Sequence, residues 1–407
     1  MRARRRPLPA GRQAHDRCAG RLDCEPVNEC RSLDRIVTHY SQGQALGDDL
    51  PRRTEPTPMN MTSITLTAAP ESDFQVFDAG NVVLQSGRTF RNMSIAYKTF
   101  GSLNADKSNV IVYPTSYSAQ HRDTQFMVSV GGALDPSRYF IVIPNLFGNG
   151  LSSSPSNTPW PDVGTRYPDV TLFDAVHVQR RMLAQLWGIE KVALVYGWSM
   201  GAMQAYHWAA LFPQAVERIA VVCGAARCAP HNHVFIEGIK HALMADPAFQ
   251  DGVFTDRPVR GFRAMARAYA SWAMSQTFYR DELWRSVGAS SLEDYLITFW
   301  EANYARRDPA DLLAQFWTWQ HADISANTLY NGDLAKALGS IRAKTLLMPG
   351  DQDLYFQVED NRRELLHLKH ADLQPIPSAW GHRAGNPVNQ PEDRAFIETR
   401  VKGLLAA

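Results

Sequence analysis

The five residues G-W-S-M-G at positions 197–201 restrict the fold of this chain more than any other stretch. The apolar residues 191–196 before them are rich in Val and Leu, which predicts a buried strand. Residues 202–212 after them are good helix formers that stop before a proline, which predicts a helix. The two glycines permit a tight turn, and the helix N-terminus directs free N–H groups at Ser199. A serine at such a strand-to-helix turn is typical of a nucleophile elbow, so we expect Ser199 to be a nucleophile.

Ser199 has one simpler interpretation, that of a helix N-cap, which is a common role of serine. A cap requires no glycine on either side, and we therefore favour the nucleophile. The loop at residues 114–118 follows another predicted strand, where this architecture places a second backbone donor for an oxyanion.

A serine nucleophile needs a base and an acid elsewhere in the chain. An imidazole must take the hydroxyl proton, and a carboxylate must fix the imidazole tautomer. In this architecture the chain order is Ser, then Asp or Glu, then His. Asp353 follows the strand predicted at residues 344–349, and His382 lies in the loop after the next strand. Asp351 competes with Asp353, which we prefer because its G-x-x-D spacing carries the chain out of the strand first.

Strands and helices alternate along most of the chain, which predicts a mostly parallel sheet flanked by helices. From about Arg227 to Leu338 the sequence is instead helical and rich in aromatic residues, which predicts an inserted cap. The fold class is therefore α/β. We expect a disordered N-terminal tail, a sheet core in two parts and a helical cap between them, with the boundaries 1–60, 61–226, 227–338 and 339–407.

The first 60 residues are polar and contain Arg, Pro and Gly without periodicity, so we expect a disordered tail. No apolar segment follows the early arginines, which argues against a secretory signal. Met59 and Met61 directly precede the first strand-like sequence. Our hypothesis is that residues 1–58 are a start-site artefact.

The composition excludes several classes of function. The 407 residues carry a formal net charge of +1, which provides no basic surface for nucleic acid. No apolar run approaches the roughly 20 residues that a spanning helix needs. We expect a cytoplasmic protein that binds a small-molecule substrate, has no nucleic-acid or membrane partner and forms a homodimer through the cap.

The five cysteines have loose spacing and include no C-x-x-C pair, so neither a disulfide framework nor a metal site is expected. Cys228, His231 and His233 come nearest to a ligand set, and we interpret them as loop or pocket wall. No cofactor is expected.

With these residues in place, the chain resembles the homoserine O-acetyltransferase family of α/β-hydrolase-fold enzymes over residues 74–405. The matching segments are 97–104, 145–150, 174–179, 199–205, 226–227 and 381–382. The resemblance implies an α/β-hydrolase fold with the inserted cap. It also implies residue roles: Ser199 as nucleophile, Asp353 as orienting acid, His382 as base, the backbone N–H groups of Met200 and Ser116 as oxyanion hole, and Arg227 as a substrate-binding residue.

Three positions depart from that family. Trp198 stands where the family usually has Gly, and residues 114–120 lack its His-Ala-Leu-Thr-Gly sequence. Arg383 follows the base, where the family has an Asp that contacts the homoserine amine. A guanidinium repels an ammonium group and suits a carboxylate. We therefore expect Arg383, with Arg227 and Trp198, to bind an anionic substrate, unless Arg383 points to solvent or pairs with an acid of the cap.

Three functions remain open. The first is hydrolysis of an ester or amide through an acyl-enzyme, and the second is O-acyl transfer from an acyl-CoA co-substrate. These two share the first half-reaction and differ in what attacks the acyl-serine. The third, a ligand receptor without catalysis, is disfavoured by the complete Ser-Asp-His set.

Overall fold

The computed structural model describes residues 73–158 and 167–407. The tail expected at residues 1–60, the proposed start at Met59 or Met61 and the strand-like sequence from Ser63 all lie outside the described residues.

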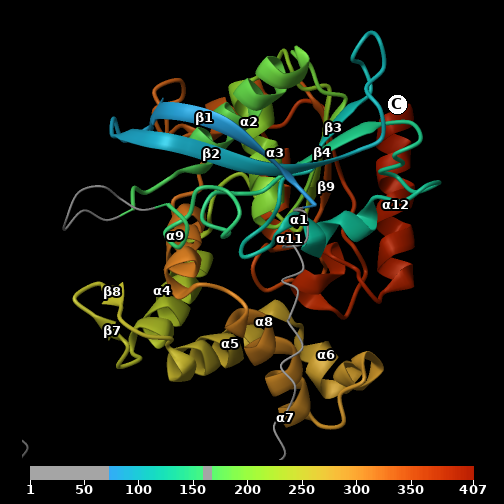
Figure 1. Cartoon of the computed structure of the whole chain (residues 1–407). Coiled ribbons are helices and arrows are strands. Elements are labelled where there is room, and N and C mark those ends of the chain that lie inside the picture. The colour runs from blue at the N-terminus through green and yellow to red at the C-terminus, as the bar shows by residue number, and fades with distance from the viewer. Residues whose placement is uncertain (1–72, 159–166) are drawn as a thin grey trace, which may run out of the picture. The chain divides into compact units, whose positions relative to one another are not determined.

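The core is an eight-stranded sheet with the order β1-β2-β4-β3-β5-β6-β9-β10 (Figure 1). Strand β2 runs antiparallel to both β1 and β4, and every other neighbouring pair is parallel. The prediction of a mostly parallel α/β-hydrolase sheet is thus confirmed. The strands are β1 (Gln75–Val83), β2 (Thr89–Phe100), β3 (Val110–Val112), β4 (Phe140–Pro144), β5 (Leu194–Trp198), β6 (Arg218–Val222), β9 (Lys344–Met348) and β10 (Ala371–Leu373).

The central strands are buried on both faces because helices cover each side. Successive side chains of one strand point to opposite faces of the sheet, so Val195 and Tyr196 of β5 belong to two different apolar clusters. Helices α2 (Leu172–Trp187) and α3 (Met200–Leu211) pack in the first cluster, while α12 (Pro391–Ala406) packs in the second (Figure 1). All residues of α3 are buried, so the elbow helix runs through the core. Three shorter helices complete this part: α1 (His121–Thr124), α10 (Leu334–Ser340) and α11 (Val358–Leu365).

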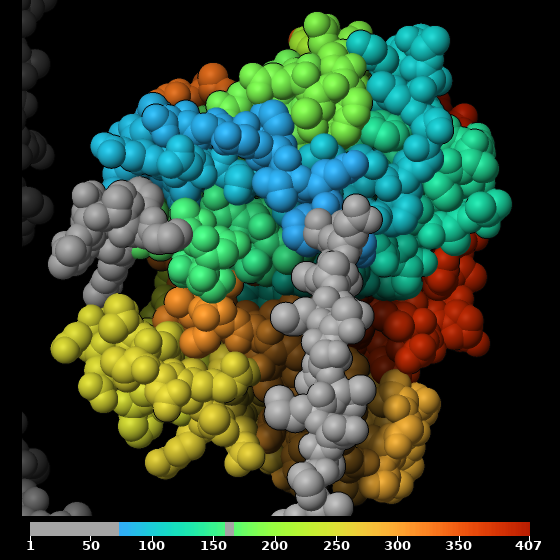
Figure 2. Space-filling view, in the orientation of Figure 1, coloured from blue at the N-terminus to red at the C-terminus, as the bar shows by residue number. Residues whose placement is uncertain are grey.

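The segment expected as a cap lies between β6 and β9 and appears yellow to orange in Figure 2. Its helix α5 packs on α4 and on a π-helical turn at Leu296–Glu301, and α9 packs on α4. Most of its aromatic side chains are buried against one another, among them Tyr269, Trp300, Phe316 and Trp319. The helices are α4 (Pro230–Met244), α5 (Val259–Ala273), α6 (Gln276–Arg280), α7 (Leu292–Tyr295), α8 (Ala302–Ala305) and α9 (Pro309–Gln320).

A small hairpin lies between two of these helices. The expectation of a purely helical segment did not include it. Strands β7 (Phe249–Gln250) and β8 (Val253–Phe254) pair antiparallel. The two residues between them, Asp251 and Gly252, have φ of 50° and 83°. An Asp-Gly pair with both φ angles positive is the preferred two-residue hairpin turn, so a local signal was present in the sequence.

No helix of residues 73–158 and 167–407 combines the length and the apolar character that crossing a membrane requires.

Candidate active site

Ser199 lies at the turn between β5 and α3 with φ 57° and ψ −126°, a backbone conformation that is strained for any residue except glycine. A Cβ atom on Gly197 would lie 2.1 Å from the carbonyl oxygen of Gly201, and one on Gly201 would lie 2.6 Å from that of Pro114. Close backbone approach therefore requires both glycines. The Ser199 side chain makes no capping hydrogen bond, which removes the N-cap interpretation.

The side chains of Ser199, His382 and Asp353 form one continuous hydrogen-bonded chain. Nε2 of His382 lies 2.9 Å from Oγ of Ser199, and Nδ1 lies 2.7 Å from Oδ2 of Asp353. All three residues are buried. In this order the imidazole can take the serine proton while the carboxylate holds its tautomer and stabilises the imidazolium.

Asp353, and not Asp351, carries the carboxylate that reaches His382. The backbone N–H groups of Tyr355 and Phe356 donate to Oδ1 of Asp353, at 2.8 and 3.3 Å, and orient the carboxylate. Asp351 is exposed and accepts a hydrogen bond from the backbone N–H of Ser378 instead. The turn after β9 thus directs Asp353 towards His382 and Asp351 towards the backbone of Ser378.

Two backbone N–H groups near Ser199 are available to a developing oxyanion. Met200 is the first residue of α3, and Ser116 lies in the loop after β3. Within the described residues, neither N–H donates to another protein atom. The hydroxyl of Ser116 donates to the carbonyl oxygen of Trp198 at 2.5 Å, which ties the loop to the elbow. Free N–H groups at this position are the donors that acyl transfer requires.

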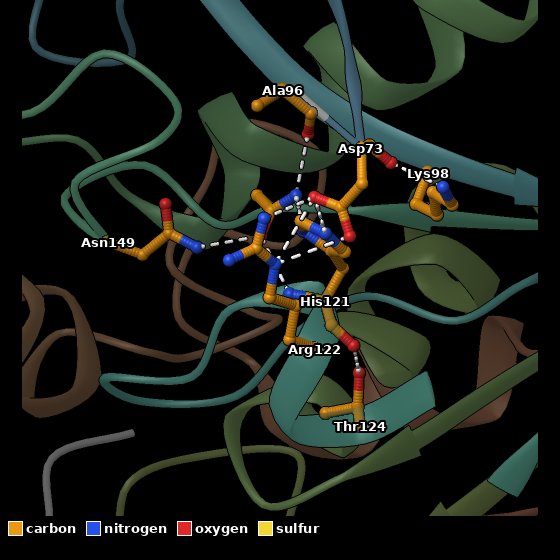
Figure 3. Close-up of polar contacts among 8 residues, drawn as sticks. Asp73, Ala96, Lys98, His121, Arg122, Thr124 and Asn149 are labelled. Carbon is orange, nitrogen blue, oxygen red and sulfur yellow. Dashed lines mark hydrogen bonds and ion pairs between the residues drawn. The ribbon is translucent and has the colours of Figure 1, made fainter. Parts of the chain in front are cut away.

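A buried polar network anchors the loop that carries Ser116 (Figure 3). Nδ2 of Asn145 donates to the carbonyl oxygen of Ala96 at 3.2 Å and lies 3.3 Å from Nδ1 of His121. Oδ1 of Asn145 accepts the backbone N–H of His121 at 3.0 Å. Nδ1 of His121 thus accepts, and its Nε2 donates to Asp73 at 3.3 Å. Asn145 and His121 were not predicted as site residues, although Asn145 begins one of the segments that match the resembled family.

The ion pair at the outer end of this network contains Asp73 and Arg122. Nη2 of Arg122 lies 2.6 Å from Oδ1 of Asp73. Hydrogen bonding from Arg122, the largest cause, together with hydrogen bonding from His121, lowers the pKa of Asp73 to about 2. Asp73 is therefore ionised at neutral pH and accepts from both residues (Figure 3).

A cavity of about 440 Å³ opens onto Ser199 and His382, between the sheet loops and the helices inserted after β6. Two predicted substrate-binding residues, Trp198 and Arg383, line it. Eight aromatic side chains form a large part of the remaining wall, namely those of Tyr117, Phe126, Tyr269, Tyr295, Phe299, Trp300, Tyr304 and Trp380. The site is thus a largely apolar pocket with the hydroxyl of Ser199 at its wall.

Arg227 does not reach this cavity, which corrects its expected place in the substrate pocket. Its backbone forms an isolated bridge with Asp323, and its Nε lies 3.0 Å from Oδ2 of the same residue. Arg227 lines a separate hollow that also contains Cys228, Asp360 and Arg363. Pairing with Asp323 fixes the guanidinium away from Ser199.

Within the described residues, one group of three side chains has the donor spacing of a metal site, namely Cys223, Asp353 and His382. The Nδ1 and Oδ2 atoms of this group bond to each other. Burial raises the pKa of the Cys223 thiol well above its ordinary value, with the Asp353 charge adding to the effect. A protonated thiol beside an engaged acid–base pair is a poor metal ligand set.

Comparison with known proteins places this geometry in a family. The sequence profile of the alpha/beta hydrolase fold family matches residues 114–379. An ethyl acetate hydrolase from Pseudomonas veronii is 38% identical over 312 residues, which cover 76% of this chain and 89% of that protein.

Two further comparisons bear on the choice between hydrolase and transferase. The crystal structure of an acetylester hydrolase from Corynebacterium glutamicum superimposes with a TM-score of 0.79 at 35% identity, covering 82% of this chain and 96% of that one. A homoserine O-acetyltransferase from Caulobacter vibrioides is 29% identical over 358 residues, covering 80% of this chain and 92% of that protein. The resemblance to the homoserine O-acetyltransferases is thus confirmed, at a greater distance than the similarity to these esterases.

Proposed function

This chain belongs to the α/β-hydrolase family, and we propose that it hydrolyses small carboxylic esters through an acyl-enzyme on Ser199. The observation that carries the proposal is the unbroken hydrogen-bonded chain from Ser199 through His382 to Asp353 at the wall of a cavity of about 440 Å³. The similarity to esterases at 38% and 35% identity supports hydrolysis as the outcome.

The proposed reaction has two halves. Oγ of Ser199 attacks the ester carbonyl carbon while Nε2 of His382 takes its proton, and the imidazolium then protonates the departing alcohol. The N–H groups of Met200 and Ser116 stabilise the negative oxygen of each tetrahedral intermediate. In the second half, His382 takes a proton from water, which attacks the acyl-serine and releases the acid. Asp353 orients the imidazole of His382 through its bond to Nδ1 in both halves.

We infer that the transferred acyl group is short. Tyr117, the residue after Ser116, stacks on Phe316 with ring centres 4.4 Å apart and lies 6.0 Å from the ring of Tyr269. Trp319 closes the same cluster at 5.9 Å from Tyr117. Tyr117 is thus held by packed aromatic rings next to the residue that carries one predicted oxyanion donor. Acetyl esters are the substrates named for the esterase relatives, and we extend that class to this chain.

A direct test is acid release from ethyl acetate in a pH-stat, with p-nitrophenyl acetate as a second substrate. The wild-type protein should hydrolyse both esters, and Ser199→Ala should retain almost none of either activity. Ser118→Ala, which removes another hydroxyl of the same loop, is the matched control. Equal activity of the wild type and Ser199→Ala would rule the proposal out.

O-acyl transfer from an acyl-CoA is the second candidate, favoured by the 29% identity with a homoserine O-acetyltransferase. Arg383 stands where that family has an aspartate, which argues against acyl transfer to an amino alcohol. The deciding assay follows release of free CoA thiol from acetyl-CoA, with and without candidate alcohols. CoA release that requires an alcohol would favour the transferase, and ester hydrolysis without CoA release would favour the hydrolase.

The proposal also covers the cellular compartment, the partners and the oligomeric state of the enzyme. We propose that the enzyme works in the cytoplasm on a small molecule, without a cofactor and without a nucleic-acid or membrane partner. Acyl-CoA would enter only as the transferase co-substrate. Pairing of two copies through residues 227–338 remains our hypothesis, and exposed apolar side chains on these helices, such as Val234, Val259 and Ile297, support it. Light scattering of the purified protein and fractionation of cells test these points.

A further inference from the structure

Arg383 is a charged residue inside the ester-binding cavity and forms no ion pair there with any of the described residues. It directly follows His382 in the chain and lines the same cavity as Ser199. Its guanidinium carbon lies 5.8 Å from the ring centre of Trp198 and 5.7 Å from that of Phe299. Among residues 73–158 and 167–407, no carboxylate forms an ion pair with it. The alternatives expected from the sequence, a solvent-directed side chain or a pair with an acid of the inserted helices, therefore do not describe Arg383.

The other charges of the cavity do not compensate Arg383. Among the residues that the structure describes, the charged side chains that line it are the four arginines 122, 306, 307 and 383 and one carboxylate, that of Asp123. Asp123 is already paired with Arg307 at 2.6 Å, and Arg122 is paired with Asp73. Arg306 is bonded to the side-chain amide of Asn303. The walls therefore carry an excess of positive charge, which attracts anions into the cavity.

Three further donors in the cavity wall lack an acceptor. The hydroxyl of Tyr117, Nε of Arg307 and Nε1 of Trp300 are buried and have no hydrogen-bond partner among the described residues, and the same holds for two acceptors, Oδ1 of Asn386 and Oε1 of Gln390. Buried donors are rarely left unpaired without a reason. An oxyanion in the cavity would supply acceptor atoms to such donors as well as a charge for Arg383.

The guanidinium of Arg383 stays charged despite its surroundings. Burial lowers its pKa, and Tyr295, Asp123 and two further tyrosines oppose that effect. Since the ordinary pKa of arginine lies far above neutrality, the side chain remains protonated at physiological pH. The rings of Trp198 and Phe299 lie beside the guanidinium, and none of the hydrogen bonds of the described residues uses its N–H groups, which can therefore donate to a ligand.

We propose that this enzyme selects esters whose alcohol part carries a carboxylate or another small oxyanion, and that Arg383 is the residue that binds this group. The inference rests on the proposed ester hydrolysis and names its substrate class. The anion belongs to the alcohol part because the acyl group is short. A carboxylate can accept two parallel hydrogen bonds from the guanidinium, which orients the ester as well as holding it.

A pair of substrates that differ in charge tests the proposal, namely 3-acetoxypropanoate and 3-acetoxypropanamide. For the wild type, kcat/KM for the carboxylate should exceed that for the amide by about tenfold or more, in line with a charge-assisted bidentate bond. In Arg383→Met the ratio should fall to about one, mainly because KM for the carboxylate rises. Arg383→Lys should keep part of the preference. Arg306→Met, which removes another cavity arginine, is the matched control and should keep most of it.

Several outcomes would overturn the inference. A wild type without preference for the carboxylate would do so, as would an Arg383→Met variant with an unchanged melting temperature that loses the same factor on both esters. If the wild type hydrolyses neither ester, calorimetric titration of the Ser199→Ala variant with both compounds decides the binding claim, which equal affinities would refute. Failure of the proposed function looks different, because Ser199 would then turn over no neutral acetyl ester at all.

Discussion

The indole ring of Trp198 stacks on the imidazole of His382, with ring centres 5.1 Å apart and 29° between the planes. The Nε1 atom of the same indole donates to the carbonyl oxygen of His382 at 3.1 Å. The residue before the nucleophile thus supports the base on two sides, its ring and its backbone. The resembled family usually has Gly at this position and cannot make either contact.

Replacing Trp198 should therefore damage the chemical step more than substrate binding. We expect Trp198→Phe, which keeps a stacking ring and loses the Nε1 donor, to lower kcat by several-fold. Trp198→Gly, which loses both contacts, should lower kcat by about tenfold or more, because a misplaced base is costly. Steady-state kinetics on p-nitrophenyl acetate measures both. A change in KM alone would mean that Trp198 serves only as pocket wall.

Ser199 should be the residue that reacts with a fluorophosphonate probe. Its hydroxyl is hydrogen-bonded to His382, whereas other serines of the described residues have no such base. Loss of a triad nucleophile typically costs about 10⁶-fold in kcat. Mass spectrometry of the labelled protein should find the adduct at Ser199 and none in Ser199→Ala. Labelling that persists in the variant would contradict the assignment.

Asp353 and Asp351, the two acids of the turn after β9, should differ strongly in how much their replacement lowers kcat. Asp353→Asn should lower kcat by about 10⁴-fold, since an amide in place of the carboxylate favours the wrong imidazole tautomer. Asp351→Asn is the matched control, because it makes the same change two residues away on a side chain that bonds only the backbone of Ser378. Activity of the two variants on one ester compares them. The reverse order of damage would show that the wrong carboxylate is assigned.

Asn145 should act through the position of the Ser116 loop. Asn145→Ala removes its bonds to His121 and to β2, and the oxyanion donor on that loop should become less well placed. We expect kcat to fall by about 10-fold or more with a smaller change in KM. Asn104→Ala, in the exposed turn after β2, is the control. An equal loss in both variants would leave Asn145 with a general structural role.

Glu364 should make the stability of the protein depend on pH. Its buried carboxylate accepts from Tyr206, Asn361 and the N–H of Ala226, yet burial outweighs these bonds and raises its pKa to about 7. The folded state therefore holds a proton that the unfolded state has released above its ordinary pKa of 4.5. The contribution of Glu364 to the free energy of unfolding is therefore fully present below about pH 4.5 and is lost as the pH rises through about 7.

Thermal melting between pH 5 and 8 checks this prediction. The melting temperature of the wild type should contain a contribution that declines over this range. Glu364→Gln, which carries no titrating group, should lack that contribution and show a flatter profile. Parallel profiles for the two proteins would contradict the role of Glu364.

The sequence by itself determined the strand–turn–helix around Ser199, the mostly parallel sheet and the order of nucleophile, acid and base. These features depend on short-range properties, namely the burial pattern of a strand and the close approach that requires Gly197 and Gly201. The hairpin turn at Asp251 and Gly252 also depends on a short-range property, the positive φ of both residues. The expectation of a purely helical segment missed it although the Asp-Gly pair was present in the sequence.

Only the tertiary structure decided which distant side chains meet. Arg227 was expected beside Ser199 and instead pairs with Asp323, while Arg383 enters the cavity with aromatic faces as its neighbours. The link from Asn145 through His121 to the Ser116 loop was invisible for the same reason. Periodicity reports whether a residue is buried, but the identity of its neighbour depends on how elements far apart in the chain pack together.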